Sequence, residues 1–294
     1  MLEKQTENHL GQVYKLFRKA KGFTLKEAAG NDISFTQLSN FENGNTMLTA
    51  DTFFAVLQNI NVNTFEFQNA YNSYLTSRDI MLFSSEITDA YLNKNIAKLK
   101  TLLKQVENLI KENPKKKKYI LDRVHVEATI AMVKPTYHVP EKDIDYLKNY
   151  LFNLKEWGIY DISLLGWCVT TFDVFTLADL TQHMLAPAQM NQKLHYVQQT
   201  IIQTVLNVIN IFINEKQFTL ANNLIHYLDE DKILDYYMYE KFTLIYSKTL
   251  LAYEQGDEAA LSTMKHCQEI LEFCECFNTA NMVADEIGKI ESKH

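Results

Sequence analysis

Apolar residues recur at helical spacing along the chain, and the first 65 residues hold short segments of this kind. The first predicted helix carries an apolar stripe made of Leu10, Val13, Tyr14 and Phe17. Such a stripe, with neighbours three or four residues apart, lies on one face of a helix. The helix is expected to end near Gly22, because glycine readily adopts the left-handed conformation that ends helices.

Capping residues mark where the next four helices begin. Thr24 is a candidate N-cap, and Glu27 three residues later completes a capping box. Ser34 is the candidate cap of a third helix that ends near Gly44. A fourth helix is expected to open at Asp51 or Thr52, and a fifth at Thr64. Five short helices predict a small all-α domain over residues 1–65.

From about residue 66 the helical patterns become longer. The expected helices cover residues 66–82, 86–112, 116–133, 141–155, 159–172, 176–186, 190–214, 217–228, 233–254, 257–274 and 277–290. They form pairs of roughly 35–45 residues, which is the period of α-solenoids. A stretch from residue 216 to 257 resembles a tetratricopeptide repeat. Residues 66–294 are therefore predicted to form a tetratricopeptide-like helical-repeat domain, so the whole chain is all-α.

Composition narrows the class of protein. The 294 residues are 47% apolar and include only 8 Gly and 4 Pro, which excludes turn-rich all-β folds. No apolar run approaches about 18 residues and the N-terminus lacks a signal-peptide pattern, so no membrane partner is expected. Four scattered cysteines indicate a reducing, cytoplasmic location. The net charge of −7 falls on residues 66–294, because residues 1–65 hold six bases and six acids.

The second and third helices have helix–turn–helix spacing, which predicts binding to double-stranded DNA. Phe35 and Leu38 are expected to face inward. Five polar residues near the start of the third helix are then free to reach base edges: Ser34, Thr36, Gln37, Ser39 and Asn40. Arg18 and Lys19 are expected to contact phosphates. The alternative is an ordinary polar helix surface.

A second candidate site lies in the helix at residues 196–214. Gln203, Asn207 and Asn210 fall within about 60° of one another on a helical projection, whereas apolar residues fill roughly 220°. This helix is therefore expected to be packed on most sides, with one narrow row of amides exposed. Side-chain amides can donate to and accept from an extended peptide backbone. The alternative is a narrow solvated stripe.

Three further residues are weaker candidates for peptide contacts. Arg78 could hold a peptide carboxylate or form a plain surface ion pair, and Asn149 and Asn153 could form a second amide ledge. The sequence has no GxGxxG, P-loop, HExxH or GxSxG motif. The cysteines and histidines lack the spacing of a zinc site. We therefore expect no enzyme activity, no cofactor and no metal.

The N-terminal motif resembles the phage-repressor (Cro/C1, or XRE) class and, more narrowly, the Rgg/GadR/MutR regulators of Gram-positive bacteria. The motif most specific for this group consists of Gln37, Leu38, Ser39, Phe41, Glu42 and Gly44. Chain length and a helical-repeat remainder agree with this resemblance. Family members usually carry basic residues where this chain has Asn40 and Asn43, so weaker non-specific DNA affinity is expected.

The resemblance implies a five-helix, lambda-repressor-like DNA-binding domain and a helical-repeat domain that senses a short peptide pheromone in quorum sensing. It also implies a cytoplasmic homodimer that binds inverted DNA half-sites and switches transcription. A short apolar peptide is the expected ligand. Two alternatives remain from the sequence: a tetratricopeptide-like scaffold that binds a protein partner, and a regulator of the same fold that needs no peptide.

Overall fold

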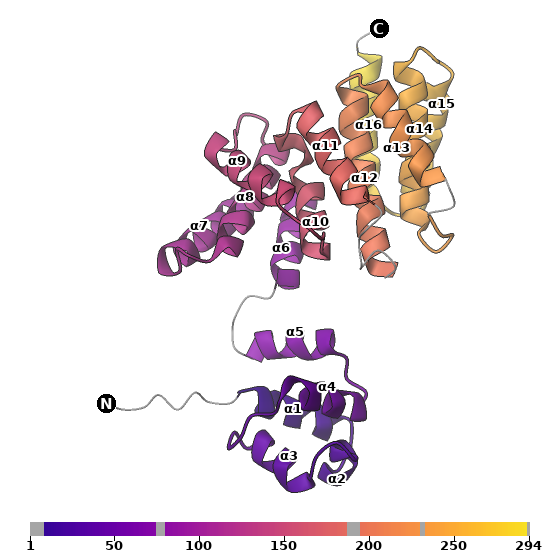
Figure 1. Cartoon of the computed structure of the whole chain (residues 1–294). Coiled ribbons are helices and arrows are strands. Elements are labelled where there is room, and N and C mark those ends of the chain that lie inside the picture. The colour runs from indigo at the N-terminus through magenta and orange to yellow at the C-terminus, as the bar shows by residue number, and fades with distance from the viewer. Residues whose placement is uncertain (1–8, 75–79, 187–194, 230–232, 293–294) are drawn as a thin grey trace. The chain divides into compact units, whose positions relative to one another are not determined.

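The computed structural model describes residues 9–74, 80–186, 195–229 and 233–292, and these residues form helices, turns and loops without a strand (Figure 1). The helices are α1 (His9–Ala20), α2 (Leu25–Ala29), α3 (Phe35–Glu42), α4 (Ala50–Asn59), α5 (Thr64–Tyr74), α6 (Ile80–Leu92), α7 (Ile96–Glu112), α8 (Lys117–Val133), α9 (Glu141–Phe152), α10 (Ile159–Cys168), α11 (Val174–Leu185), α12 (His195–Asn214), α13 (Phe218–Asp229), α14 (Met238–Glu254), α15 (Ala260–Phe273) and α16 (Phe277–Glu291). The predicted all-α fold is confirmed.

The chain divides into two compact units, Met1–Glu86 and Ile87–His294. The first unit, called here the N-terminal unit, extends beyond the expected boundary at residue 65. The reason is that α5 packs against α1, and Phe67 of α5 belongs to the core of this unit. Thr64 begins α5 as expected, whereas α4 is capped by Thr49 rather than by Asp51 or Thr52.

The second unit, called here the body, is built as two layers of helices. The helices α8, α10, α12 and α14 follow one another in one layer, because each contacts the next. The odd-numbered helices pack against this layer, α7 and α9 on α8, α11 on α12, and α13 on both α12 and α14. This alternation is the arrangement of a tetratricopeptide-like solenoid, which confirms the predicted repeat architecture.

One expected helix of the body is two helices. The sequence pattern over residues 86–112 predicted a single helix, but α6 ends at Leu92 and α7 begins at Ile96. Lys94 adopts a left-handed conformation with φ of 49°, and the Asn95 side chain accepts a hydrogen bond from the Lys98 amide as N-cap of α7. The break was missed because its left-handed residue is a lysine rather than a glycine.

The same cap ends seven helices of the described chain. In each, the backbone N–H of the third residue after the helix donates to a carbonyl five positions earlier, around a left-handed residue. These Schellman caps centre on Gly22, Gly44, Asn61, Lys94, Lys216, Gly256 and Glu275. Four of the seven are not glycine, which explains how a chain with so few glycines forms tight helix–helix turns.

The centre of the body is α12, which approaches α10 very closely. The contact occurs at Gly166, where an added Cβ would lie 2.6 Å from the Thr204 hydroxyl oxygen. That hydroxyl donates to the Ile162 carbonyl at 3.0 Å. Among the described residues, no helix is long and apolar enough to cross a membrane.

Candidate functional site

The start of α3 is fixed by a reciprocal capping box. The Gln37 amide donates to the Ser34 hydroxyl oxygen at 3.2 Å, and the Ser34 amide donates to Gln37 Oε1 at 3.1 Å. A similar box joins Thr24 and Glu27 at the start of α2. The box at Thr24 and the cap at Ser34 were predicted and are confirmed, whereas the reciprocal bond from Gln37 that completes the second box was not predicted.

The first turn of α3 presents a polar surface. Ser34, Thr36 and Gln37 are exposed, whereas Ser39 and Asn40 are half-buried. Leu38 and Phe41 are buried as expected. Phe35 was expected to face inward, but it is 60% exposed. Gln37 also has a second role, because its side chain accepts the bonds from Ser34 that cap its own helix.

Arg18 is not available to a phosphate, which corrects the expectation from the sequence. Its guanidinium is buried and donates from Nε to Glu42 Oε1 at 2.5 Å and from a terminal nitrogen to Oε2 at 2.7 Å. The other terminal nitrogen donates to the Phe23 carbonyl at 2.8 Å. This hydrogen bond with Glu42 raises the pKa of Arg18. Arg18 therefore joins α1 to α3, and exposed Lys19 remains as a candidate phosphate contact.

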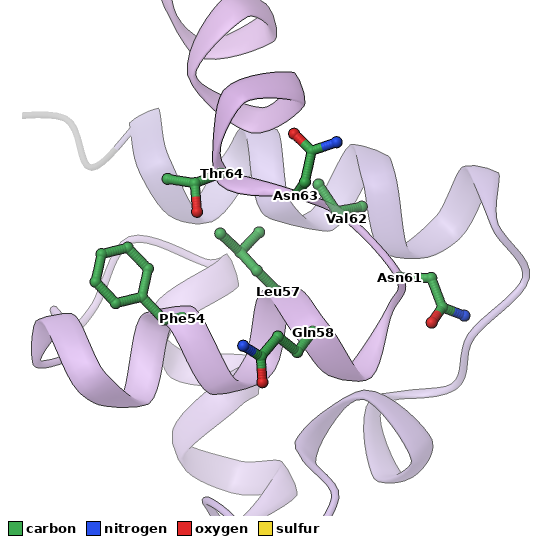
Figure 2. A pocket seen from close by; sticks show the side chains of 7 residues that line it. All are labelled: Phe54, Leu57, Gln58, Asn61, Val62, Asn63 and Thr64. Carbon is green, nitrogen blue, oxygen red and sulfur yellow. The ribbon is translucent and has the colours of Figure 1, made fainter. Parts of the chain in front are cut away.

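A shallow hollow of about 620 Å³ lies elsewhere on the N-terminal unit, where α4 turns into α5 (Figure 2). Phe54 lies at one side of it, Leu57 beneath, and the amides of Gln58, Asn61 and Asn63 around it. No residue predicted to bind DNA lines this hollow.

The amide row of α12 has the exposure expected from the sequence. Gln203, Asn207 and Asn210 are exposed, and the residues between them are buried: Thr204, Val205, Leu206, Val208 and Ile209. Helices α10, α11, α13 and α14 contact the remaining sides of α12. The prediction of a helix packed on most sides with one exposed amide row is therefore confirmed.

These amides also join neighbouring helices. Gln203 and Gln199 each donate from Nε2 to Oε1 of Glu240, at 2.7 and 2.8 Å, and Glu240 is buried. Asn207 donates from Nδ2 to the Gly166 carbonyl at 3.1 Å, near the end of α10 where carbonyls lack helical partners. The amide row therefore has a structural role in addition to any contact with a ligand.

The row leads into a groove between α12, α14 and α16. This hollow of the body, called here the first hollow, has a volume of about 450 Å³. Asn210 and Asn214 line it from α12. Its other lining residues are mainly apolar or aromatic and include Phe242, Tyr246, Leu250, Met282, Val283 and Ile290. The walls from α14 and α16 also carry charged groups, those of Glu254, Glu286 and Lys289. A largely apolar pocket with a few polar groups is the usual form of a binding site.

A second hollow of about 600 Å³ lies beside the turn between α6 and α7 and is lined by residues of α8 and α16 as well. Met282 and Lys289 of α16 line both hollows. Lys94 in the turn forms an ion pair with Asp285 of α16, with Nζ and Oδ2 3.7 Å apart. The sequence analysis missed most of these lining residues, because the helices that carry them are far apart in the chain.

Of the other candidate peptide contacts in the part of the chain that the structure describes, Gln203, Asn207, Asn149 and Asn153 line neither hollow. Asn153 ends α9, and its amide donates to the Asn149 carbonyl at 2.7 Å, so this pair forms a helix end rather than a second ledge in the groove. Arg78 lies outside the described residues.

Comparison with known proteins assigns the chain to a family. A family model described as the C-terminal domain of the HTH-type transcriptional regulator Rgg matches residues 103–285. The chain belongs to the Rgg family. It is a transcriptional regulator, and the family is not one of enzymes.

Solved structures share the fold of this Rgg-family chain over nearly its whole length. The SHP pheromone receptor Rgg2 of Streptococcus dysgalactiae is 23% identical with a TM-score of 0.71, covering 95% of this chain and 99% of that one. A putative transcriptional regulator from Listeria monocytogenes EGD-e is 15% identical, with a TM-score of 0.76 and 98% of both chains covered. The PrgX/cCF10 complex is 13% identical, with a TM-score of 0.70 and coverage of 96% and 99%.

Proposed function

We propose that this Rgg-family regulator binds DNA through the first turn of α3 and binds a short apolar peptide in the groove between α12, α14 and α16. The observation that carries the peptide proposal is the exposed amide row of α12 running into the first hollow. The solved relatives Rgg2 and PrgX, a pheromone receptor and a protein crystallised with cCF10, support it. Peptide binding would then switch DNA binding or transcription, as in quorum sensing.

For DNA, Thr36, Gln37 and Asn40 are the proposed base contacts, with Ser34 and Ser39 beside them and Lys19 on phosphate. Replacing Gln37 by Ala should weaken binding to the specific site by about 1–3 kcal/mol, because the amide contact to a base is lost. Lys19→Ala should weaken binding to every sequence and reduce the salt slope by about one. Binding isotherms at several salt concentrations measure both. Unchanged specific binding by Gln37→Ala would contradict this assignment.

For the peptide, Asn210→Ala is the sharpest variant, because Asn210 lines the first hollow and its own oxygen accepts only the surface amide of Asn214 at 3.0 Å. Asn207 and Gln203 also bond to Gly166 and Glu240, so their substitution disturbs packing as well. Calorimetry with a panel of synthetic apolar peptides should show tight binding by the wild type and weaker binding by Asn210→Ala. Asn149→Ala, exposed and outside the groove, is the matched control.

Two other outcomes distinguish the alternatives. If no peptide of the panel binds while specific DNA binding is intact, the chain is a regulator without a peptide ligand. If neither DNA nor peptide binds, the result supports the alternative of a tetratricopeptide-like scaffold that binds a protein partner. Neither result is expected from an Rgg-family chain with this groove.

A two-fold dimer is part of the proposal, because a single helix–turn–helix contact provides little affinity and Asn40 and Asn43 reduce the basic charge of this surface. Inverted half-sites should be about 34–36 Å apart or a multiple of that distance. The dimer surface is proposed to lie in the body, on the apolar helices after Asp257 and away from the turn that joins α15 to α16. Light scattering that gives a monomer at micromolar concentration, with DNA binding intact, would contradict the dimer.

A further inference from the structure

The four cysteines fall into two classes. Cys168 and Cys267 are buried, and burial raises the pKa of both thiols. Cys274 and Cys276 are exposed and lie on either side of Glu275, in the turn between α15 and α16. The thiolate is the reactive form of cysteine, and access to the sulfur is required for reaction. Of the four cysteines, the exposed pair is therefore where an oxidant in solution reaches a thiol.

The turn brings the two exposed cysteines together. Glu275 has φ of 58°, and the Cys276 amide donates to the Leu271 carbonyl at 2.8 Å, which completes the Schellman cap of α15. The Cys276 thiol folds back and donates to the Cys274 carbonyl, with sulfur and oxygen 3.6 Å apart. Cα atoms two residues apart are separated by at most about 7.6 Å. A reversal at the residue between them shortens this distance towards the roughly 4.4–6.8 Å that a disulfide requires.

We propose that Cys274 and Cys276 form a reversible dithiol–disulfide couple that senses peroxide and changes the start of α16. One thiolate attacks a peroxide oxygen, the O–O bond breaks, and a sulfenic acid and water result. The second thiol then attacks the sulfenic sulfur, the S–S bond forms, and a second water leaves. The two thiols lose two electrons and two protons, and peroxide takes up both. A low-molecular-weight thiol reverses the reaction by exchange.

The position of the couple links it to the groove. Cys276 is the residue directly before α16, and α16 supplies Thr279, Met282 and Lys289 to the walls of the two hollows. A disulfide across a single residue is strained, so its formation must change the conformation around Glu275. A strained disulfide is also readily reduced, which suits a reversible sensor in a reducing compartment. An effect on peptide affinity rests on the proposed function, whereas disulfide formation and the change at α16 do not.

The first experiment treats the full chain with hydrogen peroxide, alkylates the remaining thiols and analyses it by mass spectrometry. The expected result is the loss of two hydrogen atoms from the segment that carries both Cys274 and Cys276, reversed by dithiothreitol, with Cys168 and Cys267 still reduced. Cys274→Ser and Cys276→Ser should each abolish this product, and Cys267→Ser should leave it unchanged. Disulfide-linked dimers, or sulfinic and sulfonic acid without a disulfide, would overturn the proposal.

The second experiment compares hydrogen exchange of α16 amides in reduced and oxidised protein. Oxidation should speed exchange in the first two turns of α16 at least three-fold in the wild type and leave Cys276→Ser unchanged. Equal exchange in both states would overturn the link to the groove. Peptide affinity, measured by calorimetry in both states, should fall several-fold on oxidation. Reduced protein that binds no peptide would contradict the proposed function and leave the exchange result as the test of the couple.

Discussion

The cores of the two units differ in their share of aromatic side chains, and this difference predicts how each unit responds to substitution. In the N-terminal unit the aromatic ring of Phe67 contacts the rings of Phe17, Phe53 and Tyr71, at centroid distances of 5.0–6.3 Å. In α12 of the body the buried residues are mostly Val, Ile and Leu. A small unit has little interior, so it gains most from large aromatic side chains and from a few strong contacts. Stability is concentrated in the first unit and distributed in the second.

The largest effect is expected at the buried ion pair of the N-terminal unit. Glu42→Ala leaves the Arg18 guanidinium buried without its charge partner, so the free energy of unfolding of this unit should fall by about 3–5 kcal/mol. Amide exchange of α1 and α3 in the full chain measures this loss. Exposed Glu66→Ala is the matched control and should change little. A loss below about 1 kcal/mol would mean that stability is not concentrated here.

A smaller loss is expected at the closest helix contact of the body. Gly166→Ala places a Cβ 2.6 Å from the Thr204 hydroxyl oxygen, so α10 and α12 must move apart, at a cost of about 1–3 kcal/mol. Gly288→Ala in α16 meets no atom within 4 Å and should instead stabilise by about 0.5–1 kcal/mol. Chemical denaturation of the two variants measures both. If they behave alike, packing at Gly166 does not limit the body.

The stability of the body is expected to depend on pH through Glu127 of α8. Burial, and then the nearby charge of Asp143, raise the pKa of Glu127 to about 7 in the folded protein. Between its ordinary pKa of about 4.5 and about 7, the folded state holds a proton that the unfolded state has released, so stability falls as pH rises. Glu127→Gln should stabilise the body by about 1–2 kcal/mol at pH 8 and reduce this slope. Denaturation at pH 5 and pH 8 tests it, and an unchanged slope would contradict the assignment.

The smallest effect concerns the helix ends that both units share. Lys216 ends α12 with φ of 56°, a conformation that costs a side chain roughly 1 kcal/mol relative to glycine. Lys216→Gly should therefore stabilise the body by up to about 1 kcal/mol. Gly256→Ala, at φ of 103° with no atom within 4 Å of the added Cβ, should destabilise it by a similar amount. Thermal denaturation distinguishes the two signs.

Local features of the fold could be predicted from the sequence, whereas contacts across the fold could not. The capping box at Thr24 and the cap at Ser34 depend on residues three apart, so their pattern is visible in the chain. The turn at Lys94 could not be seen, because a left-handed lysine is uncommon and carries no sequence signal.

The candidate sites divide in the same way. The exposed row of α12 follows from helical periodicity alone and was found. The pairing of Arg18 with Glu42 joins residues 24 positions apart, and an arginine at the end of a basic helix looks the same in sequence whether it is exposed or buried. The groove walls from α14 and α16 require the solenoid to bring distant helices together.

The two hollows that share Met282 and Lys289 have a consequence for ligand length. A peptide that spans both hollows consists of two weak ligands joined by a short backbone. Once one half is bound, the other binds at an effective concentration set by that linkage, in the millimolar range for short flexible connections. Affinity should then rise steeply when a peptide becomes long enough to reach the second hollow. Either half supplied alone, even at the same total concentration, should bind far more weakly than the whole.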